Sequence, residues 1–288
     1  MSHARTIVLT SLAMTAFAGN SLLCRLALKH TSIDATSFTT IRLISGALVL
    51  WLVTRRYRGL QAGGGNWLSA LALFFYAAGF SFAYVTLPAA SGALLLFGAV
   101  QATMIGYGIW SGERLRRLQL VGLALALSGL LGLLLPGLSA PPLYGSVLML
   151  GAGLAWGIYS LRGKGAGDPT RVTAGNFLRA APVAIALSLF MFSFSFKGAS
   201  LDAAGFWYAV SSGALTSGIG YAIWYAALPA LKATNAATVQ LSVPVIAALG
   251  GIAFLGEPIT LRLGLASAAI LGGIALVVLE KHAVGGTP

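Results

Sequence analysis

The chain has 288 residues, of which 58% are hydrophobic and only 8% are charged, whereas a soluble domain carries about 25% charged residues. Its mean hydropathy is +0.88, and its 37 glycines follow no repeating triplet. This composition excludes a disordered chain, a collagen-like fibre and a coiled coil, and it is too apolar for a water-soluble globule. The sequence therefore predicts a multi-pass membrane protein.

The net charge of +12 comes from 18 Lys and Arg residues against six Asp and Glu residues. These charges stand in short clusters between apolar runs, so nucleic acid is not an expected partner. The single cysteine, Cys24, excludes an internal disulfide and a metal site built from thiolates. The sequence contains no zinc-binding His pair, P-loop or nucleophile elbow. We therefore expect no enzyme activity, no metal and no cofactor.

Ten apolar stretches are long enough, at about 20 residues each, to cross roughly 30 Å of hydrocarbon. Helices are expected, because the strands of a membrane barrel would alternate apolar and polar residues over about ten positions. The start of the chain resembles a signal peptide, but its apolar run continues past Ala18, so we expect it to be retained. The predicted spans of this all-α protein are roughly 6–28, 35–54, 67–87, 89–111, 118–135, 143–162, 172–195, 203–227, 233–255 and 261–280.

The loops between these spans differ strongly in their positive charge. With the N-terminus in the cytoplasm, twelve Lys and Arg residues fall on the cytoplasmic side and three on the other. Cytoplasmic loops carry such an excess, so both termini are predicted to be cytoplasmic. The twelve are Arg5, Arg55, Arg56, Arg58, Arg114, Arg116, Arg117, Arg162, Lys164, Arg171, Lys232 and Lys281, and the three are Lys29, Lys197 and Arg262.

Several motifs recur after roughly 140 residues. Tyr84-Val85-Thr86-Leu87-Pro88 recurs as Tyr225-Ala226-Ala227-Leu228-Pro229, Gly112-Glu113 as Gly256-Glu257, and Arg42 as Arg179. A duplication predicts one five-span repeat over residues 1–138 and a second over 139–288. Because five is an odd number, the second repeat would enter the membrane from the opposite side. This is the inverted-repeat architecture of secondary transporters.

The sequence resembles the drug/metabolite transporter superfamily, EamA type, in four features. These are the two sets of five spans, the arginine in the second span of each half, Leu-Pro before the fourth span and Gly-Glu after it. Within this superfamily, the sequence looks most like the YddG-type exporters of aromatic amino acids. The resemblance implies alternating-access export of amino acids, including aromatic ones, and of related metabolites across the inner membrane. It also implies that spans one to four and six to nine surround a cavity, with spans five and ten outside. One departure is Val100-Gln101, where the family often has a proline in the fourth span.

Aromatic rings with polar groups, and amides within apolar spans, suit a cavity that stacks an apolar side chain and binds the polar end of an amino acid. Tyr76 and Phe80 share one helix face, as do Tyr221 and Tyr225, because each pair is four residues apart. Such residues also form interfacial belts and contacts between helices, so packing is the alternative for each. The substrate-binding candidates are Asn20, Tyr76, Phe80, Gln101, Trp156, Tyr159, Tyr221 and Gln240.

A second set consists of gate or structural candidates, which lie near span ends or recur in both halves. An arginine within a span can anchor a substrate carboxylate, or it can bond backbone carbonyls near a helix end. We favour the structural interpretation for Arg42 and Arg179, because their equivalence suggests one shared role, and we interpret Arg25 in the same way. The gate or structural candidates are Arg42, Tyr84, Pro88, Arg179, Tyr225, Pro229 and Pro244.

No Asp or Glu falls deep in a predicted span, and Glu113 and Glu257 are expected to pair with their neighbours Arg114 and Arg262. A proton-driven drug pump needs a buried carboxylate, so we expect facilitated movement of a neutral or zwitterionic solute by a monomer in the lipid bilayer. The alternatives are an exporter of other metabolites or drugs and, from another class, a membrane scaffold or receptor that transports nothing.

Overall fold

The computed structural model describes residues 3–58, 64–112, 116–135, 137, 140–163, 168–194, 200–227, 230–231 and 239–283. This part of the chain is all-helical and contains no strand. The helices are α1 (His3–His30), α2 (Ala35–Arg58), α3 (Trp67–Tyr84), α4 (Ala89–Trp110), α5 (Arg117–Leu134), α6 (Leu143–Gly163), α7 (Pro169–Phe194), α8 (Ala203–Ser211), η1 (Ser212–Ile219), α9 (Gly220–Ala227), α11 (Ser242–Leu255) and α12 (Leu261–Ala283).

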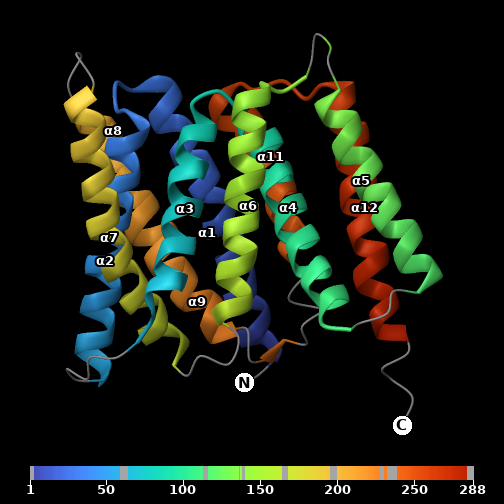
Figure 1. Ribbon diagram of the computed structural model, residues 1–288, viewed down its shortest axis with the longest axis horizontal. Coiled ribbons are helices and arrows are strands. Elements are labelled where there is room, and N and C mark those ends of the chain that lie inside the picture. The colour runs from blue at the N-terminus through green and yellow to red at the C-terminus, as the bar shows by residue number, and fades with distance from the viewer. Residues whose placement is uncertain are drawn as a thin grey trace.

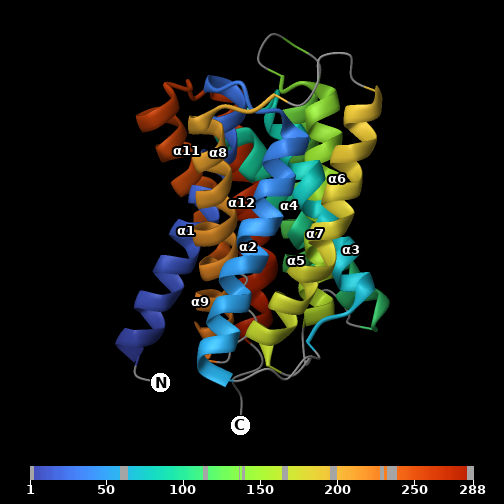
Figure 2. The same ribbon diagram turned by 90° about the vertical axis from the view of Figure 1, so that its left-hand side faces the viewer.

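The elements α8, η1 and α9 follow one another without a break, so the described helices form ten passes through the bundle (Figures 1 and 2). Each predicted span therefore contains a helix. Seven helices, α1 to α7, are long and apolar enough to cross a membrane, and α11 and α12 contain shorter apolar helices. The helix α11 begins at Ser242, inside the predicted span 233–255, and residues 233–238 of that span lie outside the described part.

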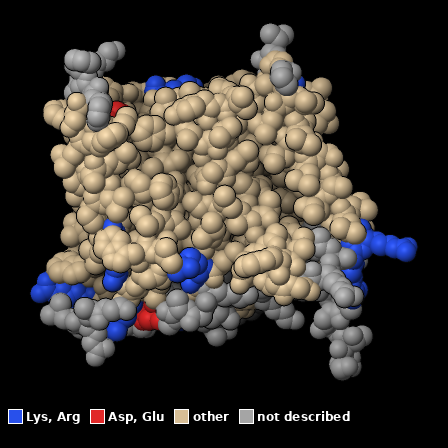
Figure 3. Space-filling model, in the orientation of Figure 1, with Lys and Arg blue, Asp and Glu red and all other residues tan. Residues whose placement is uncertain are grey.

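The outer surface of the bundle is apolar, as a lipid-facing surface requires. Large hydrophobic side chains such as Phe254, Leu261 and Trp110 are 72%, 79% and 85% exposed. Figure 3 shows a broad middle band without Lys, Arg, Asp or Glu, and most of the visible Lys and Arg side chains gather along the lower end. Polar side chains such as Asn20 and Arg42 are buried inside instead. This distribution is the reverse of a soluble globule and agrees with the predicted membrane protein.

Aspartates define the N-termini of three helices. The Oδ1 atom of Asp34 accepts hydrogen bonds from the backbone nitrogens of Thr36 and Ser37 at the start of α2. Asp168 and Asp202 cap α7 and α8 in the same way. A carboxylate at an N-cap satisfies backbone N–H groups that have no partner within the helix. Three of the chain's six acids therefore stand at helix ends and not deep within a membrane span.

The passes are arranged so that α2 packs on α7 at one side of the bundle and α5 packs on α12 at the other (Figure 1). Between these pairs lie α1, α3, α4, α6 and α11, while the run from α8 to α9 starts beside α2 and reaches the middle at α9. Close approach depends on glycine, since a side chain on Gly153 would collide with Leu96 of α4, and one on Gly273 would collide with the backbone of Gly122 in α5. The position of α5 and α12 at one edge matches their expected place outside the cavity-forming helices.

Candidate functional site

Aromatic side chains from α1, α3, α6, α7 and α9 meet in the middle of the bundle. We call them, together with the polar side chains that bond them, the central cluster. Trp156 of α6 lies at the centre of the cluster. Its ring centroid is 4.7 Å from that of Tyr76 in α3 and 4.9 Å from that of Tyr221 in α9. Trp156 also contacts Tyr159, at 5.5 Å, and Phe17 of α1, at 6.3 Å. The cluster therefore joins the first half of the chain to the second.

Arg42 of α2 reaches this cluster from the side and is only 1% exposed. Its Nη2 atom donates to the hydroxyl of Tyr76 at 3.1 Å, and its Nε donates to Oγ of Ser217 at 3.2 Å. The guanidinium carbon lies 4.9 Å from the ring centroid of Phe80, within the range of a cation–π contact. Its Nη1 atom has no hydrogen-bond partner among the described residues. Arg42 is thus a buried cation held by neutral groups.

Asn20 of α1 is the second polar member of the cluster. Its Nδ2 donates to the hydroxyl of Tyr76 at 3.3 Å, and its Oδ1 accepts from Ser212 at 2.7 Å and from Thr216 at 3.3 Å. Ser212, Thr216 and Ser217 all belong to η1, a π-helix. Short π-helical segments are rare and frequently occur at functional sites. Here the segment presents three hydroxyl groups to the centre of the bundle.

The structure brings together six of the eight predicted substrate-binding residues: Asn20, Tyr76, Phe80, Trp156, Tyr159 and Tyr221. Gln101 of α4 is buried, but no hydrogen bond or ring contact of the described residues links it to the cluster, and its Nε2 has no partner there. Gln240 lies just before α11 and is also buried. The six residues pack against one another, so their rings fill the centre in this conformation.

Several members of the cluster were not among the predicted site residues. Phe17 contacts Trp156, Tyr221 and Trp224, and Phe177 of α7 lies 5.8 Å from Tyr221. The hydroxyl residues of η1 were missed as well. Their signal in the sequence is weak, because serine and threonine are common in membrane helices, where they bond their own backbone.

The two arginines expected to share a structural role have different surroundings. Nη1 of Arg179 donates at 2.9 Å to the carbonyl oxygens of Gly64 and of Gly175, which lies one turn earlier in α7. Arg179 thus bonds backbone carbonyls, as in the structural interpretation, although Gly175 lies within α7 and not at its end. Arg42 makes no such carbonyl bond among the described contacts and instead faces aromatic rings and hydroxyl groups. The positional equivalence of the two arginines therefore does not extend to their contacts.

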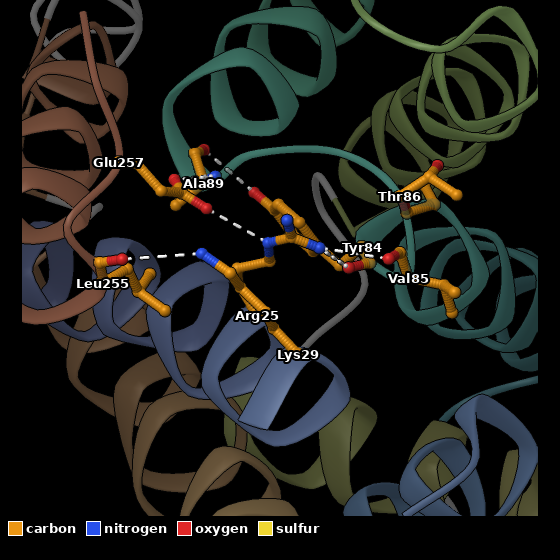
Figure 4. Close-up of polar contacts among 9 residues, drawn as sticks. Arg25, Lys29, Tyr84, Val85, Thr86, Ala89, Leu255 and Glu257 are labelled. Carbon is orange, nitrogen blue, oxygen red and sulfur yellow. Dashed lines mark hydrogen bonds and ion pairs between the residues drawn. The ribbon is translucent and has the colours of Figure 1, made fainter. Parts of the chain in front are cut away.

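A second polar group, which we call the outer ion pair, lies at the end of the bundle where α1 ends (Figure 4). Nε of Arg25 bonds Oε1 of Glu257 at 3.1 Å, and the two side chains are 11% and 8% exposed. The same guanidinium donates to the carbonyls of Tyr84 and Val85 at 2.9 and 3.1 Å. Oε2 of Glu257 accepts from the backbone nitrogen of Ala89 at 2.7 Å. The pair thus ties α1 to the α3–α4 turn and the α11–α12 turn.

The expected pairing of Glu257 with Arg262 was wrong, because the ion-pair partner is Arg25 of α1. Glu257 follows Gly256, which ends α11 with a φ of 60°, in the left-handed region that favours glycine. This turn directs the carboxylate inward to α1. Arg262 instead donates to the carbonyl of Leu135 at 2.6 Å. Glu113 and Arg114 lie outside the described residues.

The other gate or structural candidates fall into three places. Tyr84 is fully buried under the outer ion pair, with its hydroxyl 3.3 Å from the carbonyl of Ala89, and Pro88 is the N-cap residue of α4. Pro244 lies in the first turn of α11, where the missing N–H of proline costs no helix hydrogen bond. Tyr225 packs against the core from α9. Pro229 lies outside the described residues.

A cavity of about 320 Å³ lies beside the outer ion pair. Arg25, Lys29 and Glu257 line it together with hydroxyl groups of Thr86 and Ser91. A second cavity of about 430 Å³ lies near the start of α2. Within the described ranges, no group of three His, Cys, Asp or Glu residues is placed to hold a metal ion. The central cluster therefore offers a solute hydrogen bonds, one buried cation, Arg42, and aromatic surfaces.

Replacing Trp156 by alanine tests whether the central cluster contributes to function. The change removes ring contacts with Tyr76 and Tyr221, each worth about 0.5–1.5 kcal/mol. We expect solute flux in liposomes to fall by about tenfold while the protein still inserts into membranes. Trp110→Ala, at a site that is 85% exposed, is the matched control. Equal flux in both variants would show that the cluster only packs helices.

Comparisons with known proteins agree with this architecture. Residues 143–279 match the EamA-like transporter family. The uncharacterized protein PA1977 of Pseudomonas aeruginosa is 59% identical over 283 residues, which cover 98% of this chain and 97% of that protein. A solved structure described only as a crystal structure of a protein has a TM-score of 0.67 and covers 98% of this chain and 99% of its own, but at 18% identity it shows the fold alone. The chain is therefore a multi-pass membrane protein that belongs to the same family as this Pseudomonas protein, and its second half matches the EamA-like transporter family.

Proposed function

We propose that this protein exports amino acids, including aromatic ones, and related metabolites across the inner membrane by alternating access, as YddG-type exporters do. The observation that carries the proposal is the central cluster. It combines a buried cation, Arg42, with the rings of Tyr76, Trp156 and Tyr221 at the contact between the two halves of the chain. Such a site offers one surface for an apolar side chain and polar groups for its charged end.

An inverted repeat over residues 1–138 and 139–288 supports alternating access, because two similar halves can exchange conformations. The helix contacts have the pattern that such a repeat requires. The pairs α2–α7, α5–α12 and α4–α11 each join equivalent helices. The contact of α3 with α6 has its counterpart in the contact of α1 with the run from α8 to α9. Two such repeats would be related by a pseudo-two-fold axis between them. We propose that the solute binds on this axis, at the contact between the two halves.

The distribution of charge supports cytoplasmic termini. The helix α1 begins and α12 ends at the same end of the bundle, the lower end in Figure 1. Arg55, Arg117 and Arg162 belong to helix ends on this side, and Figure 3 draws most of the visible Lys and Arg side chains there. By the positive-inside rule this end faces the cytoplasm. The outer ion pair then lies on the far side and acts as the gate through which the solute leaves.

The acids support facilitated movement over proton-driven pumping. Asp34, Asp168 and Asp202 cap helices, and Glu257 lies in the outer ion pair. No carboxylate of the described residues therefore faces the central cluster. A solute would move down its own gradient, and the rate would be set by the exchange between inward-open and outward-open states.

The test is flux through the purified protein in liposomes, measured with radiolabelled phenylalanine and leucine, with and without an imposed pH gradient. We expect saturable flux of both amino acids that does not require the gradient. Flux that appears only with the gradient would disprove facilitated movement. Protein-free liposomes control for leak, and absence of any protein-dependent flux would disprove amino acid export.

A further inference from the structure

We infer that the central cluster recognises a carboxylate and not an ammonium group, so that aromatic monocarboxylates without an amino group are ligands at least as good as the corresponding amino acids. This inference rests on the proposed function for the location of the solute, but it concerns which part of the solute is recognised. The inference predicts that the transported solutes include monoanions with an apolar ring in addition to amino acids.

The first step is the charge balance at Arg42. Two of its nitrogens donate to neutral hydroxyl oxygens, those of Tyr76 and Ser217. The cation–π partners Tyr76 and Phe80 are neutral as well. A buried cation without an anionic partner is costly, and in the described part of the chain no carboxylate lies beside it. A bound anion would supply the missing charge.

The second step is the supply of hydrogen-bond donors. Nη1 of Arg42 and the hydroxyl of Tyr221 are both buried, and neither has a hydrogen-bond partner among the described residues. Unsatisfied buried polar groups are rare and require an explanation. The two side chains come from α2 and α9 and meet the same neighbours, because Arg42 bonds Tyr76 and the indole of Trp156 contacts the rings of both Tyr76 and Tyr221. A carboxylate has two oxygens and could accept from both donors at once.

The third step concerns the rest of the solute. The indole of Trp156 lies between the rings of Tyr76 and Tyr221, so a ligand held at Arg42 would meet aromatic surface on its apolar side. Since these rings fill the centre in this conformation, binding requires one of them to move aside. An aromatic ligand ring would restore the stacking contacts that are lost.

The last step is the absence of a partner for an ammonium group. Asn20 and the hydroxyl groups of η1 bond to one another, to Tyr76 or to Arg42, and they carry no charge. A monoanion would neutralise Arg42, whereas a zwitterion leaves the site with a net positive charge and a cation would add to it. In a low-dielectric interior this difference favours the monoanion.

The experiment compares three ligands that differ only in their charged groups: phenylalanine, 3-phenylpropanoate and phenethylamine. Purified protein in lipid nanodiscs is titrated with each, and the dissociation constant is taken from the rise in Tm, because a ligand of the native state stabilises it in proportion to ln(1 + [L]/Kd). We expect 3-phenylpropanoate to bind at least as tightly as phenylalanine, and phenethylamine to bind at least about tenfold more weakly. Equal or tighter binding of phenethylamine, or no binding of 3-phenylpropanoate, would overturn the inference.

A variant makes the test specific to the site. Tyr221→Phe keeps the ring and its contacts with Trp156 and Phe17 and removes only the hydroxyl group, so Tm without added ligand should change little. The dissociation constant of 3-phenylpropanoate should rise by about tenfold, as expected for a lost hydrogen bond to a charged group. Tyr144→Phe, at a side chain that is 67% exposed, is the control. Equal dissociation constants in the two variants would overturn the inference. Amino acid flux, measured separately, decides the proposed function whatever these binding constants are.

Discussion

Replacing Arg42 by glutamine is expected to lower the apparent affinity for a transported carboxylate by about 30-fold or more. The reason is that removing one partner of a buried, hydrogen-bonded charge pair costs about 2–5 kcal/mol. Glutamine keeps a donor near the position of Nε, the atom of Arg42 that bonds Ser217, but it is too short to replace the bond of Nη2 to Tyr76. The measurement is the concentration dependence of phenylalanine flux in liposomes, which gives KM and the maximal rate.

Two further arginines are controls for this substitution. Arg162→Gln changes an arginine at the end of α6 that bonds Ser69 and Asn66, and it should leave KM unchanged. Arg179→Gln breaks carbonyl bonds at a helix turn and should lower the folded yield without changing the KM of the folded protein. An unchanged KM in Arg42→Gln would restore the structural interpretation of Arg42 that its equivalence to Arg179 suggested.

Replacing Glu257 by alanine is expected to destabilise the protein by about 3–5 kcal/mol, the cost of leaving one member of a buried ion pair alone. The change also removes the acceptor of the Ala89 backbone nitrogen. Because the outer ion pair joins three segments at one end of the bundle, this end should open more often. Cys24, the fully buried neighbour of Arg25 in the sequence and the only cysteine of the chain, should then react faster with a thiol reagent.

The control for this variant is Asp202→Ala, which removes another carboxylate from the same end of the bundle. Asp202 only caps α8, and loss of a cap costs about 0.5–2 kcal/mol. Unfolding in denaturing detergent and the rate of Cys24 alkylation should therefore change less in Asp202→Ala than in Glu257→Ala. If the two variants behave alike, the outer ion pair is not the gate proposed for the end of the bundle opposite the cytoplasm.

The helices could be predicted from the sequence because hydropathy and span length are local properties. The predicted spans 89–111 and 143–162 agree closely with α4 (Ala89–Trp110) and α6 (Leu143–Gly163). The span 233–255 can be compared with the structure only from residue 239 onward. There Val239 and Gln240 are helical, and Pro244 lies in the first turn of α11, where proline fits a helix.

The aromatic part of the site was predictable for a similar reason. Tyr76 and Phe80 are spaced to share one face of a helix, and the tyrosines of the second half have the same spacing. A large aromatic residue inside a membrane helix turns toward other helices when its polar group needs a partner. Which helices meet there is a matter of tertiary packing, so Phe17 and Phe177 were missed.

Asn20 and Arg42 were named from the sequence, but their polar contacts could not be predicted, because these join residues far apart in the sequence. Ser217 lies 175 residues from Arg42, and Glu257 lies 232 residues from Arg25. Sequence neighbours pointed to Arg262 as the partner of Glu257, and repeat equivalence pointed to one role for Arg42 and Arg179. The π-helix η1, which presents its hydroxyl groups to Asn20, leaves no clear signal in the sequence.

The central claim is that a solute crosses the membrane by binding at the central cluster of an alternating carrier, and counterflow tests it most directly. Liposomes containing the protein are loaded with unlabelled phenylalanine and diluted into a trace of labelled phenylalanine. A carrier exchanges one molecule for another, so the label should accumulate transiently above its external concentration, and the overshoot should be much smaller in Trp156→Ala. Label that only equilibrates, or an overshoot of wild-type size in Trp156→Ala, would contradict this account.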